Sequence, residues 1–147
     1  MKDNRPLLIV EDSDEDFEVT CWALQQVGFT RPILRASRAE EALELLNPAQ
    51  PKYRWDDHLP CLVLLDINLP GMTGQQLLQA MRQTRQPLTV PIVILSSSLN
   101  PRDIATCYRL GAAGYFCKPL SLDRYVEKMQ GLTRYWFDAI TLPESQG

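Results

Sequence analysis

The sequence predicts an α/β fold, a doubly wound five-stranded parallel sheet covered by helices on both faces. Short apolar runs without polar alternation recur along the chain, which is typical of strands buried on both faces. Segments with apolar residues three and four positions apart lie between these runs, as expected of amphipathic helices. This alternation predicts parallel strands joined by right-handed helical crossovers.

The apolar runs define the expected strands. Four runs are rich in valine, isoleucine, leucine and aromatic residues, and the second in chain order is weaker. The expected strands are residues 7–10, 33–36, 61–65, 92–95 and 114–117.

A helix is expected after each strand, on the basis of one apolar face. The five faces comprise Phe17, Cys21, Leu24 and Val27; Ala39, Ala42, Leu43 and Leu46; Leu77, Leu78 and Met81; Ile104, Cys107 and Tyr108; and Tyr125, Met129, Leu132 and Trp136.

Helix boundaries are marked by capping residues. Ser37-x-x-Glu40 and Thr73-x-x-Gln76 fit the capping box, and Asn100-Pro101 and Ser121 fit an N-cap. Gly28 and Gly111 stand where two helices should end. Residues 47–60, which contain three prolines, are expected to form a surface loop.

Length and composition bound the function. A chain of 147 residues with 45% hydrophobic residues fits one domain, residues 1–147. The net charge of −3 argues against nucleic-acid binding. No apolar run is long enough for a membrane span, and the N-terminus lacks a signal-peptide pattern, so we expect a cytoplasmic protein. Four dispersed cysteines and one histidine, His58, make a zinc site improbable, and nothing places His58 near a thiol.

Charged and hydroxyl side chains follow four of the five expected strands. Glu11-Asp12 follows the first strand, Asp66 the third, Ser96 the fourth and Lys118-Pro119 the fifth. Ligands of open α/β sheets bind beyond the carboxyl ends of the strands, so these groups should converge. Three adjacent carboxylates call for a cation, and Mg²⁺ accepts carboxylates together with phosphate oxygens. The set is therefore suited to forming an aspartyl phosphate.

Glu11-Asp12, Asp66-x-Asn68-x-Pro70-x-x-x-Gly74, Ser96 and Lys118-Pro119 resemble the receiver domain of two-component response regulators. The resemblance extends over residues 7–135 and leaves 136–147 as a C-terminal extension. It implies a flavodoxin-like (βα)5 fold with strand order 2-1-3-4-5.

The resemblance also implies the role of each site residue. Asp66 would be the phosphoacceptor, and Mg²⁺ would be held by Glu11, Asp12, Asp66 and the backbone carbonyl of Asn68. Lys118 and Ser96 would bind the phosphoryl group, with Ser96 and Tyr115 forming a switch. The alternative is that Tyr115 is a plain core aromatic residue. The Lys118–Pro119 bond is expected to be cis.

Two features of the expected first helix each allow two interpretations. Asp14, Glu15 and Asp16 match the helix dipole as solvated acids, or else Asp14 or Glu15 contributes to docking of a kinase. Trp22 lies off the apolar face of this helix. It is either a contact for a partner or an isolated aromatic residue on the surface.

The tail, the long loop before the third strand and the run Ser96-Ser-Ser-Leu-Asn-Pro101 together resemble the small phytochrome-associated response regulators of cyanobacteria. This resemblance implies a homodimer formed through the fourth helix, fifth strand and fifth helix. The candidate dimer residues are Tyr108, Phe116, Tyr125 and Trp136. The alternative is that Trp136 and Phe137 fold back on their own domain.

We therefore expect a signal-relay protein and not an enzyme. A partner histidine kinase, of the phytochrome type if the second resemblance holds, would phosphorylate Asp66 and switch a binding or dimerisation face. One rival is an adaptor that works without phosphorylation. The other is an aspartate-nucleophile phosphatase of the haloacid-dehalogenase type, although Asn68 stands where such enzymes carry a second acid.

Overall fold

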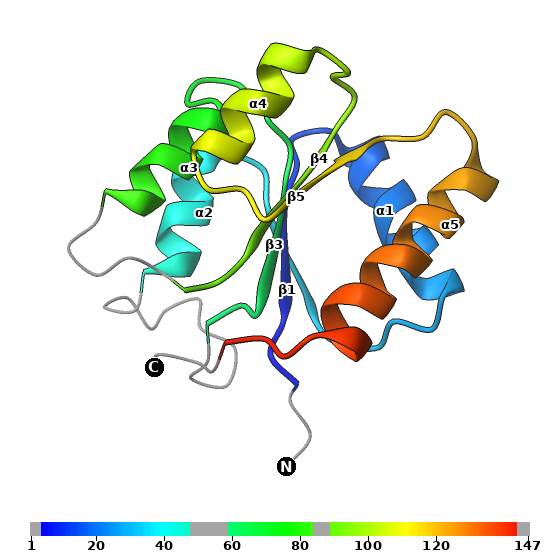
Figure 1. Ribbon diagram of the computed structural model, residues 1–147. Helices are drawn as coiled ribbons and strands as arrows, with labels where there is room; N and C mark the ends of the chain where they lie inside the picture. Colours follow the sequence, from blue (N-terminus) through cyan, green and yellow to red (C-terminus); the bar gives the residue numbers. More distant parts are fainter. Residues whose placement is uncertain (1–3, 48–58, 84–88, 144–147) are drawn as a thin grey trace.

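The computed structural model describes residues 4–47, 59–83 and 89–143 (Figure 1). Most of the expected loop at 47–60, including His58, lies outside the described residues. Five parallel strands form one sheet in the order β2-β1-β3-β4-β5, which confirms the predicted fold class and strand order. The strands are β1 (Leu7–Val10), β2 (Ile33–Ala36), β3 (Leu62–Leu65), β4 (Ile92–Ser96) and β5 (Gly114–Cys117).

Helices cover both faces of the sheet. One layer contains α1 and α5, and the other contains α2, α3 and α4 (Figure 1). A short π-helix, η2, continues α5. The helices are α1 (Asp14–Gln26), α2 (Ala39–Leu46), α3 (Gly74–Arg82), α4 (Pro101–Arg109), α5 (Leu122–Thr133) and η2 (Arg134–Ala139).

Most of the predicted helix starts are confirmed. Thr73 and Gln76 form a reciprocal capping box on α3, and the side chains of Asn100 and Ser121 cap α4 and α5. The capping box predicted at Ser37 is wrong, because α2 begins one residue later with Arg38 at its N-cap. The acid that reaches back is Glu41, whose carboxylate accepts a hydrogen bond from the Ser37 amide at 3.1 Å.

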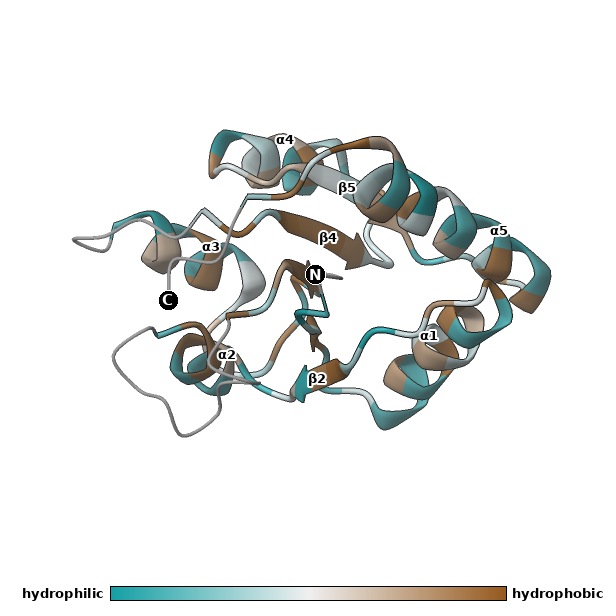
Figure 2. Cartoon of the chain, turned by 90° about the horizontal axis from the view of Figure 1, so that it is seen from below, coloured by the Kyte–Doolittle hydropathy of each residue, from teal (hydrophilic) through white to brown (hydrophobic). Residues whose placement is uncertain are grey.

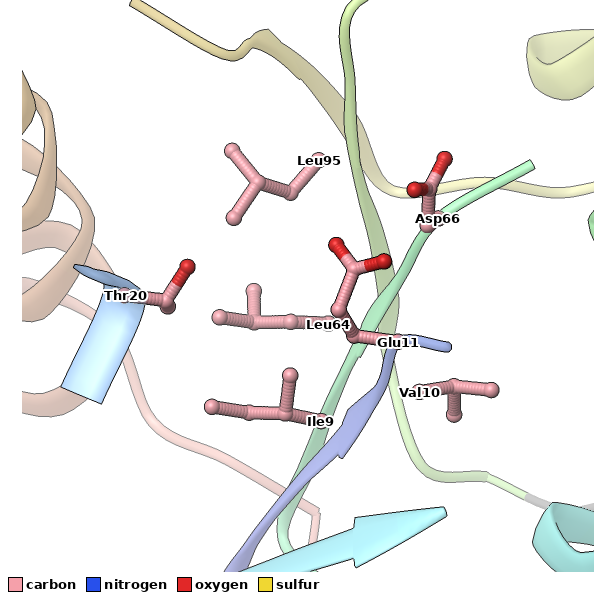
Figure 3. A pocket seen from close by; sticks show the side chains of 7 residues that line it. All are labelled: Ile9, Val10, Glu11, Thr20, Leu64, Asp66 and Leu95. Carbon is pink, nitrogen blue, oxygen red and sulfur yellow. The ribbon is translucent and has the colours of Figure 1, made fainter. Parts of the chain in front are cut away.

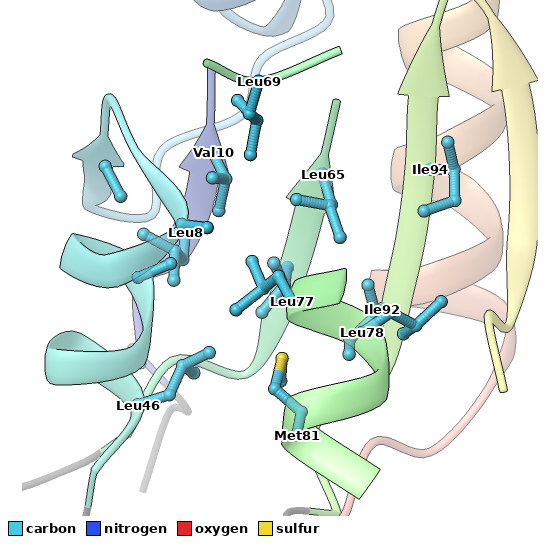
Figure 4. Close-up of a cluster of buried hydrophobic side chains, with 14 of the residues drawn as sticks. Leu8, Val10, Leu46, Leu65, Leu69, Leu77, Leu78, Met81, Ile92 and Ile94 are labelled. Atoms are coloured by element: carbon cyan, nitrogen blue, oxygen red, sulfur yellow. The ribbon is translucent and has the colours of Figure 1, made fainter. Parts of the chain in front are cut away.

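The sheet separates two buried clusters of side chains. The first lies between the sheet and α2, α3 and α4 and contains Leu8, Leu65, Leu78 and Ile92 (Figure 4). The second lies on the α1 and α5 side and contains Leu24, Leu64 and Met129. The β4 strand at the centre of this core is hydrophobic along its length, whereas the helices carry both hydrophilic and hydrophobic residues (Figure 2). Successive strand residues point to opposite faces, so a central strand supplies both clusters and must be apolar throughout.

The segment after α5 packs against the second cluster. Trp136 belongs to this cluster and is 7% exposed, and Phe137, Ile140 and Leu142 are partly buried against the same cluster. The Arg5 guanidinium also donates to the carbonyl of Pro143 at 2.8 Å. The chain from residue 136 to 143 is therefore joined to the same core as the strands.

Two of the residues predicted on a dimer face are buried within the domain. Tyr125 and Trp136 are 5% and 7% exposed, so they are not available to a partner. The physical reason is that both lie on the apolar face of α5 and η2 that covers the sheet. The alternative, in which Trp136 folds back on its own domain, is the one observed. Of the other two candidates, Tyr108 is exposed and Phe116 is half-buried.

Within the described ranges, no helix combines the length and the apolar character that a membrane crossing requires.

Candidate functional site

The carboxyl ends of the strands bring the predicted polar residues to one edge of the sheet. Glu11 and Asp12 follow β1, Asp66 follows β3, and Lys118 follows β5. The backbone continues the sheet at this edge, since the Glu11 amide donates to Ala36 and the Asp66 amide donates to Val10. Figure 3 shows the Glu11 and Asp66 carboxylates above apolar side chains such as Leu64. The parallel order of the strands therefore places these acids side by side.

The Lys118 ammonium group is the centre of the site. Nζ donates to Glu11 Oε1 at 2.5 Å, to Asp16 Oδ2 at 2.8 Å and to Asp66 Oδ2 at 2.9 Å. An ammonium group has three N–H donors, so each carboxylate takes one. The Lys118 side chain is 7% exposed, and its own amide donates to the Ser96 carbonyl at 2.8 Å. The bond to Ser96 thus fixes the backbone of the lysine, and the three acids fix its ammonium group.

Burial and pairing shift the charges in opposite directions. Burial raises the pKa of Glu11 to about 7, although the hydrogen bond from Lys118 opposes this shift. Burial alone would lower the pKa of Lys118, but the hydrogen bonds to Asp16, Glu11 and Asp66 raise it above its usual value. The ammonium group therefore stays charged and offsets part of the negative charge of the acids.

Asp66 is held at both oxygens. Oδ2 accepts from Lys118, and Oδ1 accepts from the amide of Asn68 at 3.0 Å. The turn that follows is close-packed, because a Cβ on Gly74 would stand 2.5 Å from the Cα of Ile67 and 2.6 Å from the Asp66 carbonyl oxygen. Glycine at the start of α3 lets that helix approach the backbone of the acid directly.

Three carboxylates form a pocket suited to a divalent cation. Glu11, Asp12 and Asp66 each offer one oxygen, and these oxygens lie within 4.8 Å of one another. Glu11 and Asp66 are buried, whereas Asp12 faces solvent and leaves room for water ligands. Hard cations such as Mg²⁺ and Mn²⁺ prefer oxygen donors and retain several waters. The donor set therefore fits a hard divalent cation.

The residues predicted as a switch are connected through the β4–α4 loop. Ser96 is fully buried, and its hydroxyl accepts from the Ser98 amide at 3.3 Å. The Tyr115 hydroxyl donates to the Ser98 carbonyl at 2.8 Å, and the ring packs against the first core cluster. Ser98 in turn donates to the Asp103 carboxylate at 2.6 Å. Tyr115 therefore links β5 to the start of α4.

The prediction of a cis bond before Pro119 is wrong. No cis peptide bond occurs among the described residues, so Lys118–Pro119 is trans. The trans form of an X–Pro bond is lower in free energy by roughly 0.5–1 kcal/mol. The bond to the Ser96 carbonyl positions Lys118 ahead of the proline, so its side chain reaches the acids without a cis turn.

Sequence reasoning missed two residues of the site. Asp16 was expected to be a solvated acid of the first helical turn, yet it pairs with Lys118. Its position one helical turn after Asp12 was the available signal. Arg35 is the second, because β2 ends at Ala36 and only Ser37 follows it, yet the Arg35 guanidinium contacts the loop that carries Glu11 and Asp12. The sequence contains no signal for this long-range contact.

Comparison with known proteins identifies the same group of relatives by sequence and by structure. Residues 7–130 match the family described as the response regulator receiver domain. Response regulator Rcp1 of Synechocystis sp. is 28% identical over 137 residues, covering 93% of this chain and 92% of the relative.

Two solved structures share the fold over nearly their whole length. The phosphorylated cyanobacterial phytochrome response regulator RcpA superposes with a TM-score of 0.85 at 27% identity, covering 97% of this chain and 100% of that chain. The Mn²⁺-bound form of Rcp1 has a TM-score of 0.81 at 27% identity, covering 95% of this chain and 99% of that chain. Receiver domains bind divalent cations at an acidic pocket, and the acidic cluster of this chain is consistent with the Mn²⁺-bound state of this relative.

The family match covers most of the chain, and the acids and lysine that the family motif requires converge at one edge of the sheet. The protein therefore belongs to the response regulator receiver domain family, which accepts phosphoryl groups in two-component signalling and implies a partner histidine kinase.

Proposed function

We propose that Asp66 is the phosphoacceptor and that the protein relays a signal from its histidine kinase by changing a binding surface. The observation that carries this proposal is the contact between Asp66 Oδ2 and Lys118 Nζ at 2.9 Å. The buried carboxylate can act as the nucleophile, and the fixed ammonium group beside it can neutralise charge on the phosphoryl group.

The phosphoryl transfer needs only groups that this site and the kinase supply. An Asp66 carboxylate oxygen forms the new P–O bond while the P–N bond to the kinase histidine breaks. The imidazole nitrogen keeps the electron pair of that bond. Lys118 can then donate to a phosphoryl oxygen in place of the Asp66 oxygen that it contacts now. The chain acts on its own aspartate, so we class it as a signalling domain and not as an enzyme.

The cation we propose is Mg²⁺. Glu11, Asp12, Asp66 and the carbonyl of Asn68 would hold it, and it would supply charge neutralisation for the phosphoryl oxygens. Glu11 Oε1 accepts a hydrogen bond from Lys118, so this carboxylate would serve both the ammonium group and the cation.

The response to phosphorylation would travel through Ser96 and Tyr115. The buried Ser96 hydroxyl can donate to a phosphoryl oxygen on Asp66. The β4–α4 loop that follows Ser96 carries the Ser98 carbonyl, which accepts from Tyr115. The surface that changes would be the face of α4 and β5, where Tyr108 and Phe116 offer a homodimer contact.

The signalling context we propose is light. RcpA is described as a phytochrome response regulator, and RPA3017, which matches with a TM-score of 0.86 at 25% identity, is described as acting in red light signalling of R. palustris. We therefore infer that the partner is a kinase of the phytochrome type. We propose the cytoplasm as the place where the two proteins meet.

One experiment tests the central step. The protein is incubated with Mg²⁺ and acetyl phosphate, and its intact mass is measured. We expect a gain of one phosphoryl group that is absent in Asp66→Asn and retained in Asp123→Asn, an exposed acid in the first turn of α5. A folded protein that gains no phosphoryl group from acetyl phosphate or from a kinase would overturn the proposal. Continuous release of phosphate from a phosphomonoester would instead indicate a phosphatase.

A further inference from the structure

Arg35 lies at the carboxyl end of β2, beside the loop that connects β1 to α1. Its Nε donates to the Glu11 carbonyl at 3.2 Å, and its Nη2 donates to the Asp12 carbonyl at 3.4 Å. Its Nη1 pairs with the Asp14 carboxylate at 2.7 Å. The guanidinium carbon lies over the Phe17 ring, 4.7 Å from the ring centre. One side chain thus contacts four positions of the loop and of α1.

The sheet register explains how Arg35 reaches this loop. Arg35 pairs with Ile9 across the parallel β2–β1 ladder, and paired residues point to the same face of a sheet. That face carries α1, so the guanidinium projects under the chain that turns from β1 into the helix. The side chain is 26% exposed, and its guanidinium carbon lies over the Phe17 ring.

The two carbonyls that Arg35 binds belong to the two neighbouring acids of the cation pocket. Glu11 has further support, because its carboxylate accepts from Lys118 and from the Ser13 amide. Within the described part of the chain, nothing donates to the Asp12 carboxylate, and this residue is exposed. The position of the Asp12 oxygens therefore depends on the backbone of residues 11 and 12, which Arg35 holds.

We propose that Arg35 is a positioning residue for the divalent cation, acting through the backbone of Glu11 and Asp12. This inference rests on the proposed function, since it concerns the same pocket. Partners that orient metal ligands typically change metal affinity ten- to a hundredfold when they are removed.

The proposal makes a prediction opposite to that of simple electrostatics. A positive charge next to a cation site repels the cation, so removing the charge of Arg35 should tighten binding if charge alone matters. If positioning dominates, removing the guanidinium loosens binding. Lysine keeps the charge but cannot offer three directed donors and a flat face, so it separates the two effects.

The test measures Mn²⁺ binding to the full chain by the electron paramagnetic resonance signal of the free ion, with calorimetry as a second readout. Arg35→Lys and Arg35→Gln are compared with Arg31→Gln. Arg31 is the matched control, because its guanidinium also lies 4.7 Å from an aromatic ring, that of Phe137. Arg31 precedes β2 and so lies at the amino ends of the strands, away from the cation pocket. Urea unfolding is recorded for every variant, because a merely structural role would lower stability without changing the dissociation constant of the folded protein.

We expect both Arg35 variants to raise the dissociation constant for Mn²⁺ about tenfold or more, while Arg31→Gln stays at the wild-type value. Arg35 variants that bind as tightly as wild type, or more tightly, would overturn the role of Arg35 and leave the pocket intact. A wild-type protein that binds no Mn²⁺ would overturn the cation pocket itself, and the role of Arg35 with it. If Arg35→Gln does not fold, Arg35→Lys, which keeps the charge and the stem, decides the question.

Discussion

Asp16 Oδ2 lies 2.8 Å from Lys118 Nζ, so the first turn of α1 holds the ammonium group that also contacts Asp66. Asp16 is 44% exposed at its side chain, and it is the outermost of the three carboxylates around Lys118. The position of the lysine is therefore set partly by a helix that contributes no phosphoacceptor.

Replacing Asp16 tests this connection. We expect Asp16→Ala to slow phosphorylation by acetyl phosphate roughly fivefold, the equivalent of about 1 kcal/mol for a partly exposed ion pair. Glu15→Ala is the matched control, because it removes the same charge from an exposed neighbouring position. The rate is followed by intact mass. Equal rates for the two variants would show that only net charge matters at this position.

Gly74 provides a test of the turn that follows Asp66. We expect Gly74→Ala to lower the free energy of unfolding by about 1–3 kcal/mol, because the new Cβ would meet backbone atoms that cannot move aside easily. Gly131 lies within α5 with nothing within 4 Å of its Cβ position, so Gly131→Ala should raise stability by roughly 0.5–1 kcal/mol. Urea unfolding measures both changes. A stable Gly74→Ala protein would contradict the close approach of α3 to Asp66.

Tyr125 should make stability depend on pH in the alkaline range. Its hydroxyl lies 2.9 Å from that of Thr20, and burial raises the pKa of Tyr125 above its usual value of 10.0. The folded protein then holds this proton more tightly than the unfolded chain does. The free energy of unfolding should therefore fall as pH rises above about 10, where the unfolded chain loses the proton first.

Tyr125→Phe removes this ionisation. Its urea midpoint should fall less steeply than that of the wild type between about pH 8 and about pH 11, after a loss of about 1 kcal/mol at neutral pH. Tyr135→Phe, at a tyrosine that is 53% exposed, should keep the wild-type slope. Parallel curves for Tyr125→Phe and wild type would show that the hydroxyl of Tyr125 is not the titrating group.

Trp136 and Tyr108 separate the roles of core and surface. Trp136→Ala should destabilise the domain by about 3–5 kcal/mol, since a large side chain is lost from the second core cluster. Tyr108→Ala, at a residue that is 50% exposed, should leave stability within about 0.5 kcal/mol and weaken the proposed homodimer. Urea unfolding and sedimentation at several concentrations measure the two effects. A dimer that survives Tyr108→Ala unchanged would place the contact elsewhere.

The fold could be predicted from sequence because each element carries a local signal. Leu62–Leu65 is apolar at every position, as a central strand must be, and Thr73 and Gln76 share one helical turn. Such patterns depend only on neighbours in the chain. The convergence of Glu11, Asp66 and Lys118 was also predictable, because parallel strands bring their carboxyl ends together.

The remaining features depend on contacts that local patterns do not record. Asp16 and Arg35 reach their partners across the fold, and only Asp16 has a local signal, its position one helical turn after Asp12. Trp136 could have faced a partner or its own core, and only the packing of the chain after α5 decides this. The bond before Pro119 depends on a small difference in free energy, which a motif cannot settle.

The hydrogen bond from Arg5 to the carbonyl of Pro143 joins two residues that lie 138 positions apart in the chain. The two ends of the described chain therefore meet at one place on the surface. A circularly permuted protein, made by linking these ends and opening an exposed turn, should keep all four strand pairings of the sheet. The order in which the strands are synthesised is thus separable from the order in which they pair.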